Sequence, residues 1–142
     1  MLVRDIMSSP PKVLKLSQTA EDAAEMMALH DVGALPVCEG DELVGVVTDR
    51  DVVLRCVAQG FTPAKTPVTK IMTRPPATID AGEPAEEAAW LLTSLRIRRL
   101  PVTENGRLVG MVTADDIARR LEDDDVILRM ARRVAPRRRA AR

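Results

Sequence analysis

Residues 35–51 read LPVCEGDELVGVVTDRD, and residues 100–116 read LPVTENGRLVGMVTADD. The two stretches align without a gap at a spacing of 65 residues, and the alignment extends from Val3 on Val68 to Val57 on Glu122. Roughly one third of the aligned pairs are identical, and most of the others exchange one apolar residue for another. Self-similarity at a fixed period is typical of a repeated supersecondary unit. We therefore expect two copies of one fold.

The same strands and helices are predicted in both copies. Short strands are expected at 13–16 and 78–80, each after a proline pair. Thr19 followed by Asp22 predicts a capped helix start, and small apolar residues then recur at helical spacing. The polar segment inside each quoted stretch predicts a β-hairpin, because Asn105-Gly106 is a strong hairpin signal.

A second helix completes each copy, from Asp49 to a terminating Gly60 in the first and from about Ala114 in the second. The predicted fold class is therefore α+β, with two β-α-β-β-α repeats. One such repeat would be marginal alone, so we expect the two to pack together. The expected organisation is repeat 1 at residues 1–60, a linker at 61–67, repeat 2 at 68–125 and a basic tail at 126–142.

The composition favours a soluble, globular chain. Hydrophobic residues make up 46% and charged residues 30%, and no apolar run approaches the ~20 residues of a membrane span. The first residues contain Asp5 and two prolines, which are atypical of a secretory signal, so we expect a cytoplasmic protein without a membrane partner. The formal net charge is zero, yet residues 126–142 hold seven arginines and no acid, which leaves the rest at −7.

Few side chains are available for several common chemistries. The only aromatic residues are Phe61 and Trp90, whereas single-strand nucleic-acid readers stack bases on several. One histidine, His30, and two cysteines, Cys38 and Cys56, are too few for a histidine–cysteine zinc site. Neither a Gly-x-x-x-x-Gly-Lys phosphate loop nor a Gly-x-Ser-x-Gly elbow is present. We therefore do not expect an enzyme.

Each copy contains the pattern Gly-hydrophobic-hydrophobic-Thr-x-x-Asp, at 45–51 and at 110–116. One interpretation is purely structural, because a threonine N-cap with an acid three positions later is close to a capping box. The other is functional, because such a turn presents backbone N–H groups to phosphate and an acid that can accept hydrogen bonds from a ribose diol. The two interpretations are compatible, since one aspartate can cap the empty helix and hold a ribose when occupied.

These combined features resemble the CBS domain family, in which two repeats form a Bateman module. The resemblance rests on the duplicated β-α-β-β-α unit, the Leu-Pro-Val strand and the Thr-x-x-Asp turn, and it covers residues 3 to about 122. The stretch 31–53 also resembles small stand-alone two-CBS proteins of the hypoxic response kind. The resemblance implies repeats packed about a pseudo-two-fold axis, with clefts that bind adenosine-containing ligands: AMP, ADP, ATP, S-adenosylmethionine or NAD.

The resemblance also assigns roles to individual residues. Ribose and phosphate would contact Thr48 with Asp51, and Thr113 with Asp116. The adenine would be bordered by Val13, Leu14, Thr78 and Ile79. A basic residue before the Leu-Pro-Val strand contacts phosphate in some members, and that role carries over to Arg98 and Arg99.

The two candidate sites differ in charge. The second copy has Arg98 and Arg99 where the first has Gly33 and Ala34, while Arg50 of the first copy is replaced by Asp115. We expect unequal sites, of which at most one binds a phosphorylated ligand tightly. The alternative is that the two arginines lie on a solvated face and form ion pairs with Glu86 and Glu87.

Two further features suggest partners. Trp90 lies about 140° from the small-residue stripe of its helix, which points to an outward face and favours a homodimer. The arginine-rich tail could bind acidic surfaces, although a solvated end is the commoner outcome and we do not expect nucleic acid.

The sequence therefore predicts a regulatory module that binds adenosine nucleotides between its repeats and signals to an unidentified regulated protein by a conformational shift. The alternative is a ligand-free interaction or structural protein that acts through its dimer surface.

Overall fold

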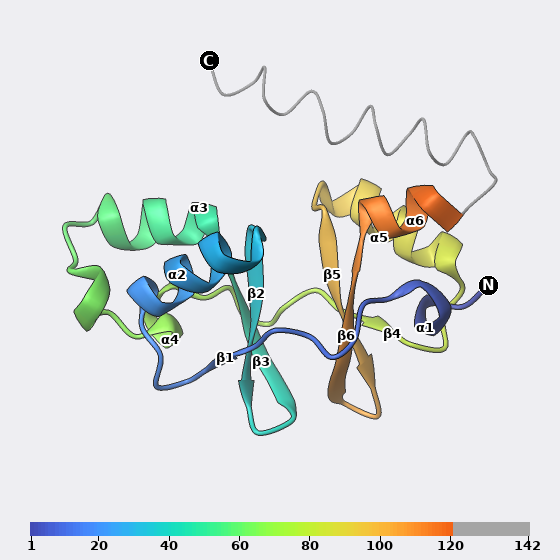
Figure 1. Cartoon of the computed structure of the whole chain (residues 1–142), viewed down its shortest axis with the longest axis horizontal. Coiled ribbons are helices and arrows are strands. Elements are labelled where there is room, and N and C mark those ends of the chain that lie inside the picture. Colours follow the sequence, from blue (N-terminus) through green and yellow to red (C-terminus); the bar gives the residue numbers. More distant parts are fainter. Residues whose placement is uncertain (121–142) are drawn as a thin grey trace, which may run out of the picture. The chain divides into compact units, whose positions relative to one another are not determined.

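The computed structural model describes residues 1–120, and the predicted basic tail at 126–142 lies outside the described residues. The architecture is mixed α+β, as the sequence predicts, and the chain divides into two compact units (Figure 1). The first-repeat unit comprises Lys12–Pro76 together with Gly106–Leu108. Among the described residues, the second-repeat unit comprises Met1–Pro11, Ala77–Asn105 and residues 109–120.

The first-repeat unit contains a mixed sheet in which β2 lies between β1 and β3. Strand β1 is parallel to β2, and β2 is antiparallel to β3 across the predicted hairpin. Thr19 caps α2 through the predicted reciprocal bonds with Asp22. The elements are β1 (Leu14–Lys15), α2 (Ala20–His30), β2 (Ala34–Glu39), β3 (Glu42–Thr48), α3 (Asp49–Asp51), the π-helix η1 (Val52–Val57), the 3₁₀-helix η2 (Pro63–Lys65) and α4 (Val68–Ile71).

The second-repeat unit repeats this plan. Strand β4 is parallel to β5, and β6 neighbours β5. Asn105 and Gly106 both take positive φ values at the hairpin turn, as the Asn-Gly signal predicts. One difference is the start of α5, where Pro84 occupies the N-cap in place of a threonine. The elements are α1 (Val3–Ile6), β4 (Ile79–Asp80), α5 (Ala85–Leu95), β5 (Arg99–Glu104), β6 (Arg107–Thr113) and α6 (Ala114–Arg120).

The short helices α1 and α4 are absent from the predicted repeat, and they pack in an unexpected way. Val3 and Ile6 of α1 are buried in the core of the second-repeat unit, with Ile79, Leu100 and Val112 among their neighbours. In the same way, the buried residues of α4 belong to the first-repeat core. Each compact unit therefore differs from its sequence repeat, because it takes its leading helix from the other one (Figure 1).

Two equivalent glycines hold these leading segments against the hairpins. The backbone of Ser8 pairs antiparallel with Met111, and that of Thr73 pairs with Val46. A Cβ atom at Gly110 would lie 2.7 Å from the Ser8 carbonyl oxygen, and one at Gly45 would lie 3.1 Å from the Thr73 carbonyl oxygen. The strands can approach so closely only because neither position carries a side chain.

We predict that Gly110→Ala destabilises the protein by about 1–3 kcal/mol, the usual cost of overpacking a tight site. Gly45→Ala should cost less, because the atom nearest to its added Cβ is the flexible Met72 Sδ at 2.6 Å, whereas Gly110 also faces fixed backbone at 2.7 Å. Urea unfolding followed by circular dichroism measures both. Equal stability of Gly110→Ala and wild type would show that the close approach is not required.

Candidate functional site

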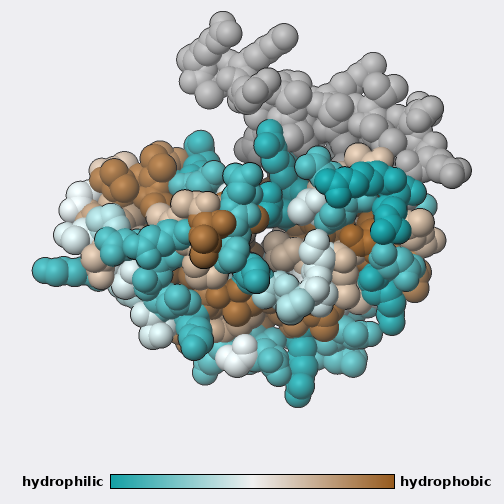
Figure 2. Space-filling view, viewed as in Figure 1, coloured by the Kyte–Doolittle hydropathy of each residue, from teal (hydrophilic) through white to brown (hydrophobic). Residues whose placement is uncertain are grey.

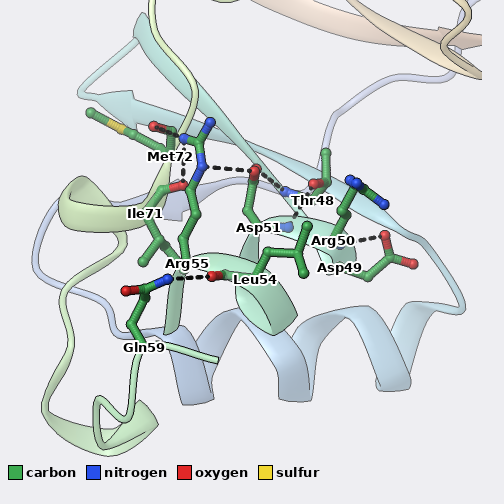
Figure 3. Close-up of polar contacts among 9 residues, drawn as sticks. All are labelled: Thr48, Asp49, Arg50, Asp51, Leu54, Arg55, Gln59, Ile71 and Met72. Carbon is green, nitrogen blue, oxygen red and sulfur yellow. Dashed lines mark hydrogen bonds and ion pairs between the residues drawn. The ribbon is translucent and has the colours of Figure 1, made fainter. Parts of the chain in front are cut away.

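The first candidate site is the turn from β3 into α3, called here the Thr48–Asp51 turn (Figure 3). The Thr48 backbone N–H donates to Asp51 Oδ2 at 2.9 Å, and the Asp51 N–H donates to Thr48 Oγ1 at 3.1 Å. This is the reciprocal capping box that the spacing predicts. Asp51 is only 8% exposed, so the box fixes an almost buried carboxylate at the end of the strand.

The second candidate site, called the Thr113–Asp116 turn, has the same geometry between β6 and α6. The Thr113 N–H donates to Asp116 Oδ2 at 2.9 Å, and the Asp116 N–H donates to Thr113 Oγ1 at 3.0 Å. Asp116 is half-buried, so its carboxylate is more accessible than that of Asp51. The structural interpretation of the motif is thus confirmed in both copies, and the same carboxylates remain candidates for a diol.

Arg55 distinguishes the Thr48–Asp51 turn from its counterpart. Its Nε lies 3.6 Å from Asp51 Oδ1, and its Nη1 donates to the carbonyl oxygens of Ile71 at 3.3 Å and Met72 at 3.2 Å (Figure 3). The guanidinium therefore joins the site aspartate to the end of α4, where backbone carbonyls lack helical partners. Within residues 1–120, the equivalent Arg120 makes no ion pair with Asp116.

The helix that carries Arg55 is also unusual. Immediately after Asp51 the chain changes from α-helix to a π-helix over Val52–Val57, whereas the equivalent residues 117–120 are α-helical. Short π-helical segments are rare and often accompany functional sites. Arg55 was not among the predicted site residues. Its position four residues after Asp51 on a predicted helix indicates an ion pair, because residues at this spacing lie side by side on the helix surface.

We predict that Arg55→Ala lowers the free energy of unfolding by about 1 kcal/mol. The side chain is 51% exposed, so the ion pair adds little, and the loss comes mainly from the two carbonyl bonds. The matched control is Arg50→Ala, because the exposed Arg50 side chain makes no ion pair within the described residues, and it should change stability by less than about 0.5 kcal/mol. Urea unfolding measures both variants, and equal losses would contradict the role of Arg55.

The residues that precede the Leu-Pro-Val strands lie beside these turns. The Asp49 N–H donates to the Gly33 carbonyl oxygen at 2.9 Å, and the Ala114 N–H donates to the Arg98 carbonyl oxygen at 2.8 Å. Arg98 and Gly33 thus occupy equivalent positions beside the two turns. The backbone of Arg98, which is predicted to bind phosphate, contacts Ala114, the first helical residue after Thr113.

The predicted cationic residues differ in exposure. Arg98 and Arg50 are exposed, while Arg99 is half-buried at the start of β5. In the described part of the chain, no ion pair joins Arg98 or Arg99 to the acids at 86–87, so the alternative pairing considered for them does not form. Their contact with ligand phosphate stays a prediction.

The predicted adenine-bordering residues divide into two groups. Leu14 and Ile79 are buried in the two cores, so their side chains serve packing. Val13 is half-buried and Thr78 is exposed. Leu14 pairs with Val37 of β2, and Thr48 pairs with Ala34 at the start of β2. The chain just before β1 therefore lies toward the same end of β2 as the Thr48–Asp51 turn. Val13 and Thr78 are therefore the accessible members of the predicted set.

Both cysteines are free and buried, as expected of structural thiols. Burial, and in second place the nearby Asp41 carboxylate, raise the pKa of the Cys38 thiol. A raised pKa keeps the thiol protonated and poorly nucleophilic. The Cys56 thiol lies 3.7 Å from the Phe61 carbonyl oxygen, to which it donates.

The motif geometry agrees with a direct family comparison. The model of the CBS domain matches residues 3–57 and again residues 68–123. The chain belongs to the CBS domain family. Its relatives include the CBS domain-containing protein YhcV of Bacillus subtilis, which is 38% identical over 116 residues and 82% of each chain. Hypoxic response protein 1 of Mycobacterium tuberculosis is 35% identical over 125 residues and 87% of each chain.

Solved CBS structures match the fold closely. Hypoxic Response Protein I, crystallised with two coordinated zinc ions, aligns with a TM-score of 0.79 and 36% identity over 85% of this chain and 99% of that one. The CBS domain pair of MJ0100, in complex with 5′-methylthioadenosine and S-adenosyl-L-methionine, gives 0.73 and 33% over 84% and 98%. CBSX2 in complex with AMP gives 0.72 and 30% over 83% and 93%.

Two features of the described part of the chain concern metal binding and membrane insertion. Within residues 1–120, histidine, cysteine, aspartate and glutamate side chains form no group of three or more that could hold a metal ion. Within the same residues, no helix has the length and apolar character needed to cross a membrane.

Proposed function

We propose that this CBS protein is a cytoplasmic, non-catalytic regulatory module that binds adenosine-containing ligands at the Thr48–Asp51 and Thr113–Asp116 turns. The observation that carries the proposal is the recurrence, in both units, of a carboxylate fixed by the same two hydrogen bonds. Related CBS pairs bind AMP, or 5′-methylthioadenosine and S-adenosyl-L-methionine, which supports this ligand class.

The chemistry of the turn suits a ribose. In each capping box one aspartate oxygen accepts a backbone N–H, and a carboxylate oxygen can accept a second donor. The remaining lone pairs of Asp51 and Asp116 can therefore accept the two hydroxyl groups of a vicinal diol without breaking the cap. Arg98 and Arg99 supply positive charge for a phosphate at the Thr113–Asp116 turn. Val13 is the candidate for contact with adenine in the first-repeat unit, and Thr78 is the candidate in the second.

Signalling in this proposal is a population shift. A ligand changes a conformational equilibrium only by its difference in affinity for the two states. The proposed ligand favours one conformation of the module, which a regulated protein then recognises. Arg55 supplies a specific route in the first-repeat unit, because a ribose that engages Asp51 Oδ1 competes with a guanidinium that also holds the end of α4.

We predict that AMP, ADP, ATP, S-adenosylmethionine or NAD raises the melting temperature. A ligand present at 100 times its Kd adds about 2.7 kcal/mol, which corresponds to roughly 5–10 °C for a chain of this size. The double variant Asp51→Ala/Asp116→Ala should lose the shift, because it lacks both diol acceptors. Its matched control, Asp115→Ala, removes an exposed acid of the same turn and should keep the shift.

Thermal denaturation followed by circular dichroism gives the measurement, with each variant compared with its own ligand-free melt. An unchanged melting temperature of the wild-type protein with all five compounds would contradict the proposal. An undiminished shift in the double variant would place the ligand elsewhere.

The second candidate function is interaction through a homodimer surface. Trp90 on α5 is 60% exposed, as predicted, and Leu95 on the same helix is 47% exposed. The first-repeat unit also exposes Val53 and Val57 of η1, and Figure 2 shows hydrophobic surface over this helix at the left of the view. Large apolar side chains at the surface are typical of interaction sites.

We predict that Trp90→Glu reduces self-association, because a charge in an apolar interface must be desolvated without a partner. Sedimentation velocity should show a dimer for the wild-type chain and a shift toward monomer for the variant. Lys15→Glu, at an exposed strand position, serves as the control and should sediment like the wild-type protein. A monomeric wild-type chain would exclude the homodimer.

A further inference from the structure

The two Thr–Asp turns are equivalent in backbone but differ in charge at several equivalent positions, one pair of which joins the turn to the Leu-Pro-Val strand. In each unit the first residue after the threonine donates its N–H to the residue before the Leu-Pro-Val strand. This pair is Asp49 with Gly33 in the first-repeat unit and Ala114 with Arg98 in the second. The charge of this pair is therefore negative in the first-repeat unit, where Asp49 carries it, and positive in the second, where Arg98 carries it.

The Asp49 side chain is exposed, and it contacts the Arg50 backbone and lies in the space beside Gly33. Its Oδ1 accepts the Arg50 backbone N–H at 2.8 Å (Figure 3), and its Oδ2 would lie 3.1 Å from a Cβ atom at Gly33. Gly33 therefore leaves the space that this carboxylate fills, and an arginine there would have to displace it. The negative charge directly follows Thr48 in the turn that holds Asp51.

Nearby cations do not cancel this charge equally. Arg55 is already engaged by Asp51 and two carbonyl oxygens, so it is not free to hold a phosphate. Arg50 and Arg98 are both exposed and make no ion pair in the described part of the chain, so each would lose side-chain entropy on binding a phosphate. The units differ because the first has the uncharged Ala34 where the second has the additional cation Arg99. In the second-repeat unit, Arg98 and Arg99 together outweigh the exposed Asp115.

We propose that Asp49 makes the Thr48–Asp51 turn selective for adenosine ligands without a 5′ phosphate, such as neutral thioethers or sulfonium compounds, while the Thr113–Asp116 turn takes phosphorylated ones. The proposal rests on the proposed function and adds the ligand class of each turn. The Asp49 charge makes the electrostatic potential at the 5′ position of the ligand more negative, and it leaves the ribose and base contacts unchanged. One chain would then respond to two different adenosine metabolites.

The test uses the full-length chain and two probes, AMP and 5′-methylthioadenosine, titrated separately. Two-dimensional ¹⁵N–¹H spectra resolve the backbone amides of residues 45–51 from those of 110–116, so each turn reports its own Kd. The key variant is Asp49→Asn, which keeps an oxygen acceptor for the Arg50 N–H and removes only the charge. Asp49→Ala reproduces the residue of the other turn, and Ala114→Asp is the reciprocal exchange.

In the wild-type protein we expect AMP to bind the Thr113–Asp116 turn more tightly than the Thr48–Asp51 turn. We expect 5′-methylthioadenosine to bind the Thr48–Asp51 turn at least as tightly as it binds the Thr113–Asp116 turn. Asp49→Asn and Asp49→Ala should improve AMP binding at their turn roughly tenfold, the order expected for removing one nearby charge. Ala114→Asp should weaken AMP at its turn by a similar factor. The affinity for 5′-methylthioadenosine should stay within about twofold throughout.

Two results would overturn the inference while leaving the proposed function intact. One is equal binding of AMP at both turns of the wild-type chain. The other is an unchanged ratio of AMP to 5′-methylthioadenosine affinity in Asp49→Asn and Asp49→Ala, with both variants shown to be folded by their spectra. If neither probe moves the amides of either turn, the selectivity also fails, whereas the proposed function is decided separately by the thermal shifts with the five compounds.

Discussion

The structure depends on the close backbone approach at Gly45 and Gly110. Each glycine lets an extended segment pair with the middle of a hairpin, and that segment is tied directly to a short buried helix. These pairings hold the segments through which Val3 and Ile6 join the second-repeat core and the buried face of α4 joins the first. The same two strands end at Thr48 and Thr113, so the packing that completes each core also positions each candidate site.

In the proposed function, the Thr–Asp turn is both a stabilising device and a recognition site. A capping box satisfies two backbone donors at a helix start. The same bonds fix a carboxylate in one orientation, which lowers the conformational cost of accepting a diol. In the first-repeat unit Arg55 orders Asp51 further and joins it to α4. The second turn lacks this contact among the described residues, and its aspartate is more exposed.

Local and repeated features could be predicted from the sequence. The strands, the hairpins, the Thr19 cap and both Thr–Asp boxes follow from short spacings that each copy repeats. The helices α1 and α4 were missed, because four residues carry too little periodicity to indicate a helix. Their exchange between cores was also beyond prediction, since Val3 and Val68 occupy identical positions in two similar repeats and either core could accept either one. The contact between Asp49 and Gly33 required coordinates, because the two residues are far apart in the sequence.

The exchanged helices have a consequence for biosynthesis. Residues 1–11 are translated well before Ile117, with which Val3 and Ile6 share a core. This segment must therefore stay unburied until the chain has been translated as far as Ile117. A fragment that encodes one sequence repeat alone would likewise lack the short helix that completes its core.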